Sequence, residues 1–239
     1  MIYFIRDHKS GFKQSKNIAY YFNQNFREKI ELLVLYKYQL EKVKTAPEKF
    51  VVFIRNPREI IVSGYLYHQI CSEPWAVKKG GNYFEDYRFK IDEDDIKFAN
   101  DFSVPKSYQN KLKGMSQEEG LKYEMNMVGY LTLSGLNEIL KVNRPNVFFL
   151  DMDQFTFNFE PTVNKLFKFL ELPEDNLTKH FKNVLSIKVN LLGKRKITNH
   201  ITNKELKVDR YKNYWNDELE KELNFKFPDL IKNYEDKIL

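Results

Sequence analysis

The chain has 239 residues, of which 42% are hydrophobic and 15% aromatic, so it carries enough apolar surface for a folded core, and global disorder is excluded. Its formal net charge of +6 favours partners with negative groups, such as nucleotides, phosphate groups, anionic glycans or nucleic acid. The single cysteine, Cys71, excludes an internal disulfide, and no apolar run reaches the roughly 18 residues of a membrane span. We therefore expect a soluble, cytoplasmic protein.

Short apolar runs alternate with helical patterns along the chain. In order, the sequence predicts a strand at 2–5, a helix at 15–26, strands at 31–36 and 50–54, a helix at 58–69, an irregular segment at 80–116, a helix at 117–142, a strand at 146–150, helices at 161–170 and 176–184, and a helical tail from 216 that is interrupted at Pro228. This alternation predicts an α/β fold, a three-layer sandwich with a central parallel sheet flanked by helices. We expect one domain over 1–239, with an irregular insertion around 72–116.

A polar, basic loop follows the first predicted strand. It consists of His8, Lys9, Ser10, Gly11, Phe12, Lys13, Gln14 and Ser15. Ligands of parallel sheets bind beyond the carboxyl ends of the strands, and a glycine turn at a helix start offers backbone N–H groups to a phosphate. The loop is therefore a candidate phosphate site, with a merely solvated turn as the alternative. The spacing G-x-x-x-x-G-K-[ST] of nucleotide hydrolases is absent.

A second candidate loop follows the strand at 50–54. Arg55 stands at the strand end, Pro57 fits the first turn of the next helix, and Ser63 follows Arg55 by eight positions. Two turns of helix advance the chain by about 12 Å, so an arginine and a serine at this spacing can grip one phosphate from two sides.

These residues carry a resemblance to a known family. The run F-I-R-N-P-R-E-I-I-V-S-G-Y at 53–65 closely resembles the 3′-phosphate-binding motif of sulfotransferases that use 3′-phosphoadenosine 5′-phosphosulfate (PAPS), and K-S-G at 9–11 looks like the 5′-phosphosulfate loop of that family. The segments 147–155 and 163–172 are similar to its late strand, acidic turn and helix. The resemblance spans most of the chain and implies a P-loop-like nucleotide-binding fold, with the insertion around 72–116 on the acceptor side.

The resemblance also implies roles for matching positions. Lys9 and the loop around it hold the 5′-phosphosulfate and offset charge on the leaving oxygen, while Arg55 and Ser63 hold the 3′-phosphate. The family supplies a late basic loop to the same phosphate, for which Lys194, Arg195 and Lys196 are the candidates.

The catalytic base departs from the pattern of many cytosolic members. Those members place a histidine about twenty residues before the motif arginine, whereas this chain has none between His8 and His68. Carbohydrate-modifying and bacterial members, which use a glutamate after the second strand, are the better match. Glu41 is therefore the first candidate, Glu48 the second, and His68, one turn beyond Ser63, the third.

The acceptor, the oligomeric state and whether the chain is part of a longer protein are left open by the sequence. Trp75, Tyr83, Phe84 and Tyr87 are candidates for stacking on an acceptor ring, with core packing as the alternative reading of each. No pair of residues has metal-ligand spacing, so we expect no metal, and we expect no nucleic-acid partner.

Transfer of a sulfuryl group from PAPS to a hydroxyl or amine is the predicted function, with a carbohydrate or a small molecule as candidate acceptors. A kinase-like phosphoryl transferase and a non-catalytic, basic nucleotide- or RNA-binding module are the alternatives.

Overall fold

The computed structural model describes residues 1–81, 83–84, 93–192 and 209–238. These residues form a four-stranded parallel sheet in the order β2-β1-β3-β4. The strands are β1 (Ile2–Arg6), β2 (Ile30–Val34), β3 (Lys49–Ile54) and β4 (Val147–Asp151). Each coincides within a few residues with a predicted apolar run, and the predicted α/β fold with a central parallel sheet is confirmed.

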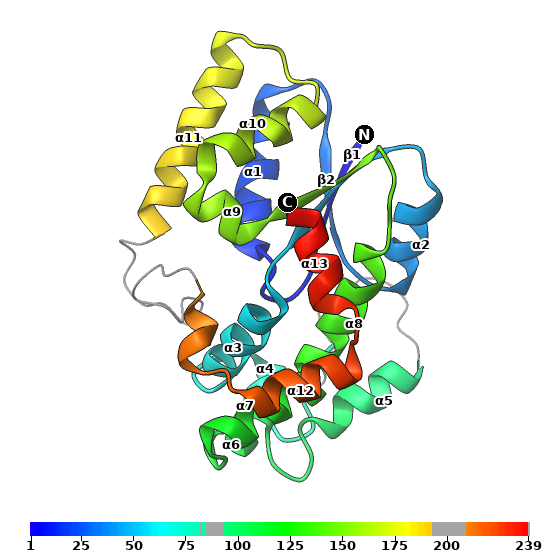
Figure 1. Cartoon of the computed structure of the whole chain (residues 1–239), viewed down its shortest axis with the longest axis vertical. Helices are drawn as coiled ribbons and strands as arrows, with labels where there is room; N and C mark the ends of the chain where they lie inside the picture. The colour runs from blue at the N-terminus through cyan, green and yellow to red at the C-terminus, as the bar shows by residue number, and fades with distance from the viewer. Residues whose placement is uncertain (82, 85–92, 193–208, 239) are drawn as a thin grey trace.

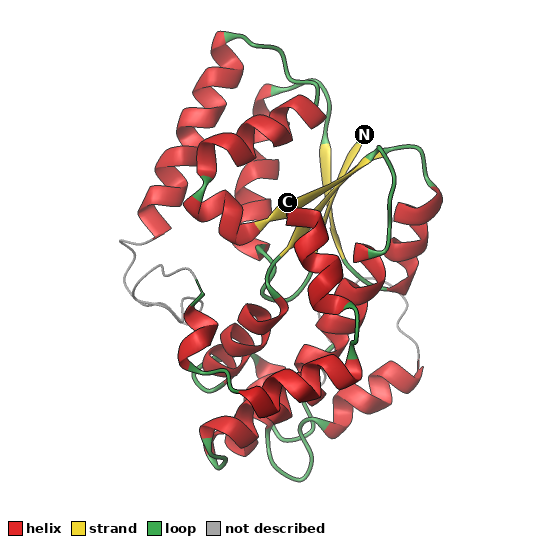
Figure 2. Cartoon of the chain, in the orientation of Figure 1, coloured by secondary structure: helices red, strands yellow, loops and turns green. Residues whose placement is uncertain are grey.

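Helices cover the sheet on both faces (Figures 1 and 2). They are α1 (Phe12–Asn25), α2 (Lys37–Thr45), α3 (Pro57–His68), α4 (Pro74–Val77), α5 (Glu93–Asp101), α6 (Tyr108–Lys113), α7 (Gln117–Asn126), α8 (Val128–Leu140), α9 (Met152–Phe157), α10 (Phe159–Phe169), α11 (Asn176–Leu192), α12 (Asp217–Lys226) and α13 (Leu230–Ile238), with a 3-10 turn, η1, at Arg210–Asn213. In Figure 1, α1, α9, α10 and α11 lie on one side of the sheet, and α2, α8 and α13 lie on the other. Among the described residues, no helix is long and apolar enough to cross a membrane.

The alternation of side chains along β1 divides the core into two clusters. Ile2 and Phe4 point to the cluster that includes α1 and α11, whereas Tyr3 and Ile5 point to the cluster that includes α3 and α8. All five residues of β1 are buried, as is typical of a central parallel strand.

Two sequence-based expectations were wrong in detail. The segment 72–116 is not wholly irregular, because α4, α5 and α6 occupy much of its described part. The single helix predicted at 117–142 is broken at Met127, whose φ of −116° and ψ of −106° are not helical. A side chain at Gly129 would place its Cβ 2.3 Å from Cδ1 of Ile61, so the break is accompanied by direct packing of α8 on α3.

The register of the sheet places the two candidate loops next to each other. β1 and β3 pair in parallel, with Ile5 opposite Val52, so the segment after Arg6 and the segment after Ile54 leave the same edge of neighbouring strands. Adjacent strands lie about 4.8 Å apart. Lys9 and Arg55 therefore start from a shared edge although 46 positions separate them in sequence.

Gly11 is required where the first loop enters α1. Its φ is +105°, which residues with a side chain rarely adopt, and a Cβ there would lie 2.5 Å from Sδ of Met152 and 3.2 Å from Cδ1 of Phe53. The loop consequently lies directly against β3 and the start of α9.

We expect Gly11→Ala to lower the free energy of unfolding by about 2–4 kcal/mol, because strain at positive φ adds to an overpacked contact. Gly114→Ala is the matched control, since Gly114 has a φ of −90° and a Cβ there would lie no closer than 3.6 Å to its neighbours, so that change stays within about 1 kcal/mol. Urea denaturation of both variants measures the difference. Equal stabilities of the two variants would contradict the assigned backbone conformation.

Candidate functional site

The loop after β1 is braced by its own serine. The Ser10 hydroxyl donates to the Asp7 carbonyl at 2.9 Å and accepts from the Asp7 N–H at 2.8 Å, and the Ser10 N–H donates to the same carbonyl at 3.2 Å. Lys9, between them, has a φ of +61°, which belongs to a left-handed turn. The hydroxyl of Ser10 therefore fixes the shape of the loop.

The loop ends at the start of α1. Gly11 is the N-cap and provides no side-chain hydrogen bond, so the first N–H groups of the helix are not capped by that residue. Ser15 lies behind the loop, where its buried hydroxyl accepts from Nη1 of Arg6 at 3.4 Å, and Gln14 is half-buried. Phe12 and Lys13 form the first turn, with their side chains outside the described part of the chain.

The side chain of Lys9 lies beside an aromatic ring and near acidic side chains. Its Nζ lies 3.0 Å from the centre of the Tyr67 ring, and the Tyr67 hydroxyl donates to Glu73 at 2.7 Å. Burial lowers the pKa of Lys9 to about 7, with a further lowering by the Arg55 charge and an opposing effect of Glu73. An anionic ligand beside Lys9 would favour its charged form.

Arg55 extends from the end of β3 into a cluster of charged groups. Its Nη2 lies 3.3 Å from Glu59, and its Nε lies 3.7 Å from Asp153 at the start of α9. Glu59, almost fully buried, also accepts from Nη2 of Arg210 at 3.2 Å and from the Tyr211 N–H at 2.6 Å. Burial raises the pKa of Asp153 to about 6, although the Arg55 charge acts in the opposite direction.

The structure brings the two main sequence candidates together. Lys9 and Arg55 follow neighbouring strands at the carboxyl edge of the sheet, and the Arg55 charge adds a small part to the lowering of the Lys9 pKa, of which burial is the main cause. Ser63 lies buried on α3, the helix that Arg55 precedes. The candidates Lys194, Arg195 and Lys196 lie outside the described residues.

Two histidines and a glutamate form a hydrogen-bonded chain beside the loop. Nε2 of His8 lies 3.1 Å from Nε2 of His68, and Nδ1 of His68 lies 2.8 Å from Oε2 of Glu124, which also accepts from the Tyr108 hydroxyl at 2.8 Å. His68 and Glu124 are fully buried. Burial lowers the pKa of His8 well below its usual range, and the charges of Lys9 and His68 add to that effect.

When both rings are neutral, the hydrogen bond to Glu124 assigns the tautomer of each histidine. A carboxylate accepts only, so the Nδ1–H of His68 donates to Glu124, and Nε2 of a neutral His68 then accepts from the Nε2–H of His8. Nδ1 of a neutral His8 keeps its lone pair. The hydrogen-bonded chain therefore leaves one unprotonated nitrogen on the residue next to Lys9, and the lowered pKa of His8 keeps that ring neutral.

The two glutamates predicted as bases are not brought to this group. Glu41 has a side chain that is 65% exposed and pairs with Lys44 on the same helix, α2. Glu48 immediately precedes β3, so it lies at the amino edge of the sheet, whereas Arg55 lies at the carboxyl edge. No described contact joins either carboxylate to Lys9 or Arg55.

Glu124 and Arg210 were not found from the sequence. Glu124 stands 56 positions after His68, and Arg210 stands 151 positions after Glu59. A weak signal existed for Glu124, because it falls on the same helical face as Leu121 and Met125, where an acid among apolar residues needs a partner. No comparable signal marks Arg210.

The tautomers can be read by nitrogen-detected NMR of the histidine rings, of which the chain has four. We expect His68 to carry its proton on Nδ1 and His8 to carry its proton on Nε2, with the His68 pattern changed in Glu124→Gln. The variant His180→Gln removes the NMR signals of His180, a histidine outside this group, and so identifies them in the spectrum. A proton on Nε2 of His68, alone or in addition to Nδ1, would contradict the assigned hydrogen bond, in which His8 donates to His68.

Asp7 provides a pH-dependent stability test. Its Oδ1 accepts from the His8 N–H at 2.6 Å, but burial dominates and raises its pKa to about 8. A raised carboxyl pKa gives stability at low pH that is lost as pH rises from about 4 through 8. In Asp7→Asn the neutral amide avoids this loss, so its advantage over the parent protein grows by as much as about 1.4 kcal/mol per pH unit. Chemical denaturation between about pH 5 and 7 measures this slope, and a pH-independent difference would refute the raised pKa.

Comparison with known proteins gives a likeness in fold. No model of a known protein family matches the sequence, and no curated protein matches it. Among solved structures, the fold is similar to that of mouse sulfotransferase SULT7A1 complexed with PAP, with a TM-score of 0.54 and 13% sequence identity over 99% of this chain and 85% of the mouse chain. The chain thus has the α/β, P-loop-like fold of a sulfotransferase, in which helices flank a central parallel sheet.

Proposed function

We propose that the protein transfers a sulfuryl group from PAPS to a hydroxyl or amine acceptor. The observation that carries this proposal is the parallel pairing of β1 with β3, because of which the Lys9 loop and Arg55 follow neighbouring strands at the same edge of the sheet. Two cationic groups at neighbouring strand ends suit a nucleotide with phosphates on both the 3′ and 5′ positions of its ribose. The likeness of the fold to a sulfotransferase supports the same reading.

The donor is held by groups from both loops. Lys9 and the N–H groups at the start of α1 bind the 5′-phosphosulfate, and Arg55 with Ser63 binds the 3′-phosphate. Lys194, Arg195 and Lys196 are proposed to complete the 3′-phosphate site. Asp153, beside Arg55, takes up a proton more readily than an ordinary carboxylate, which limits its repulsion of a bound phosphate.

Sulfuryl transfer then proceeds in line. A bond forms between the acceptor oxygen or nitrogen and sulfur, and the bond from sulfur to the bridging oxygen of the 5′-phosphate breaks, so that 3′-phosphoadenosine 5′-phosphate (PAP) leaves. Lys9 stabilises the charge that develops on that oxygen. Positioning and electrostatics carry the reaction, as they do in phosphoryl transfer.

The acceptor proton goes to the chain formed by His8, His68 and Glu124. Nδ1 of His8 takes the proton as the acceptor attacks. Burial and the Lys9 charge lower the pKa of His8 and oppose this step, whereas the negative charge of the bound donor and, through His68, the carboxylate of Glu124 favour it. His68, a base candidate in the sequence, thus acts through His8. Glu41 and Glu48 are not needed in this scheme.

The two alternative functions make different demands on the ligand. A kinase-like enzyme binds ATP, and a nucleic-acid-binding module binds short RNA, without any dependence on a 3′-phosphate. A thermal-shift comparison of PAP, ATP and a short RNA separates the three, with stabilisation by PAP alone expected here.

Removing either cation is expected to weaken PAP binding by at least about 100-fold, because each makes a charge-assisted contact to a phosphate. Isothermal titration of Arg55→Ala and Lys9→Ala measures this loss. Lys44→Ala is the control, since Lys44 is 40% exposed and pairs only with Glu41 among its described ion pairs.

The two variants also differ in which phosphate they stop recognising. Arg55→Ala loses the preference for PAP over ADP, which lacks the 3′-phosphate, whereas Lys9→Ala retains that preference at lower overall affinity. Unchanged affinity for PAP in both variants would remove the basis of the proposed function.

A further inference from the structure

Two carboxylates flank the guanidinium of Arg55, and they are held differently. Glu59 accepts from Nη2 of Arg55 at 3.3 Å and is almost fully buried, whereas Asp153 lies 3.7 Å from Nε and its side chain is 25% exposed. Glu59 also accepts hydrogen bonds from Arg210 and from the Tyr211 N–H. Among the described ion pairs, Asp153 has Arg55 alone. Asp153 is therefore the carboxylate that an incoming anion can displace more easily.

The side of Arg55 that faces Asp153 offers a hydrogen-bond donor. Nε of Arg55 is buried and has no hydrogen-bond partner in the part of the chain that the structure describes. The 3.7 Å between Nε and Oδ1 of Asp153 is too long for a hydrogen bond, so the two groups attract each other only through their charges. A phosphate bound by two N–H groups of a guanidinium would use this donor and would then lie beside the Asp153 carboxylate.

The charge of Asp153 changes within the range of pH in which the folded protein can be studied. Burial raises its pKa to about 6, although the Arg55 charge acts in the opposite direction. The carboxyl group is therefore ionised in about 97% of molecules at pH 7.5 and in about 9% at pH 5. The charged and titratable groups around it are Arg55 after β3, Asp151 at the end of β4, Glu59 on α3 with Arg210 beyond it, Asp209 before η1, and Tyr234 of α13, which bonds to Asp151.

We propose that Asp153 is a specificity-determining residue of the donor site, whose carboxylate competes with the 3′-phosphate for Arg55 and makes recognition of that phosphate dependent on pH. A nucleotide with a 3′-phosphate then gains affinity when Asp153 loses its charge, whereas a nucleotide without that group does not. This inference rests on the proposed 3′-phosphate site at Arg55 and adds to it a residue that weakens binding.

Two nucleotides that differ only in the 3′-phosphate provide the test. Adenosine 5′-monophosphate (AMP) is PAP without that group, so the ratio of the two affinities isolates its recognition. At pH 7.5 we expect Asp153→Asn to bind PAP at least about fivefold more tightly than the parent protein, because a like charge close to the phosphate is removed, while its affinity for AMP stays within about twofold. Isothermal titration measures both. Asp236→Asn, which removes one charge from an exposed position on α13, is the matched control and should change neither affinity.

The pH dependence distinguishes an effect of charge from an effect of shape. At pH 5 the parent protein already carries a mostly neutral Asp153, so the gain from Asp153→Asn should fall below about twofold. The 3′-phosphate itself titrates near pH 6, and comparing parent and variant at the same pH cancels that contribution. Asp153→Ala, which cannot donate a hydrogen bond to the phosphate, is expected to give the same pattern.

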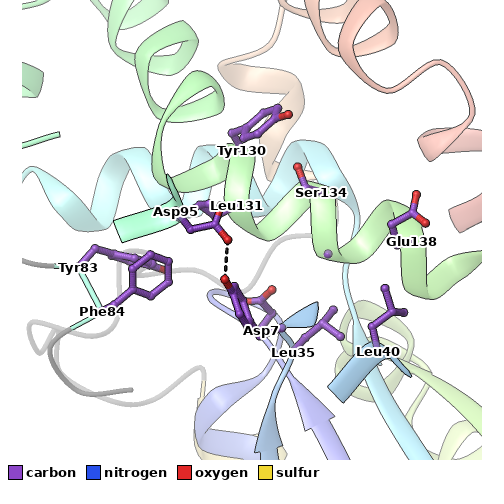
Figure 3. A pocket seen from close by; sticks show the side chains of 12 residues that line it. Asp7, Leu35, Leu40, Tyr83, Phe84, Asp95, Tyr130, Leu131, Ser134 and Glu138 are labelled. Carbon is purple, nitrogen blue, oxygen red and sulfur yellow. Dashed lines mark hydrogen bonds between the residues drawn. The ribbon is translucent and has the colours of Figure 1, made fainter. Parts of the chain in front are cut away.

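Asp7 is a second carboxyl group with a raised pKa near the two loops, and it must be separated from Asp153. It lines a cavity of about 340 Å³ between α2, α5 and α8, which neither Arg55 nor Asp153 lines (Figure 3). Asp7 is two positions before Lys9, the residue proposed to hold the 5′-phosphosulfate. PAP and AMP both carry a 5′-phosphate, so Asp7→Asn should show the same ratio of PAP to AMP affinity as the parent protein at each pH.

The outcomes separate this inference from the function on which it rests. A parent protein that binds PAP no more tightly than AMP lacks the 3′-phosphate site, which overturns the proposed function and this inference together. A parent protein that prefers PAP, with the same preference at pH 7.5 in folded Asp153→Asn and Asp153→Ala, overturns this inference alone. An equal gain at pH 5 and pH 7.5 in Asp153→Ala also overturns it, because the charge of Asp153 would then not be the cause. A cooperative thermal transition shows that each variant is folded.

Discussion

The parallel pairing of β1 with β3 is the constraint on which the candidate site depends. Ile2 lies opposite Lys49 and Ile5 opposite Val52, so the two strands end at the same level of the sheet. The strands are buried over nearly all of their length, so polar side chains of the two following loops can gather where the strands end. Gly11 completes the arrangement, since only a residue without a side chain lets the first loop lie against Phe53 and Met152.

At this edge of the sheet, two buried carboxylates pair with basic side chains. Glu59 holds Arg55 and Arg210, and Glu124 holds His68. Buried pairs of this kind contribute little net stability, because desolvation cancels most of the attraction, but leaving one member alone is costly. The main effect of the network is therefore to fix the orientation of Arg55 and of the histidine rings. Its contribution to the free energy of folding is small.

The loop after β1 is tied to the rest of the molecule through His8. Its ring contacts His68 on one side and Tyr83 on another, while the Asp7 carbonyl accepts hydrogen bonds from Ser10 and so supports the loop that carries Lys9. The positive φ of Lys9 marks the left-handed turn within this loop.

The sequence by itself determined the strands, the parallel α/β fold and the two polar loops, because apolar runs, helical periodicity and the R-N-P turn are local patterns. It named Glu41 and Glu48 as candidate bases, which no described contact joins to Lys9 or Arg55, and it missed the break at Met127. Only the tertiary structure decided that His68 meets Glu124, that Arg210 meets Glu59 and that α2, α5 and α8 enclose a cavity. The two side-chain contacts join residues 56 or more positions apart, and their existence depends on how helices pack across the sheet, which no spacing along the chain encodes.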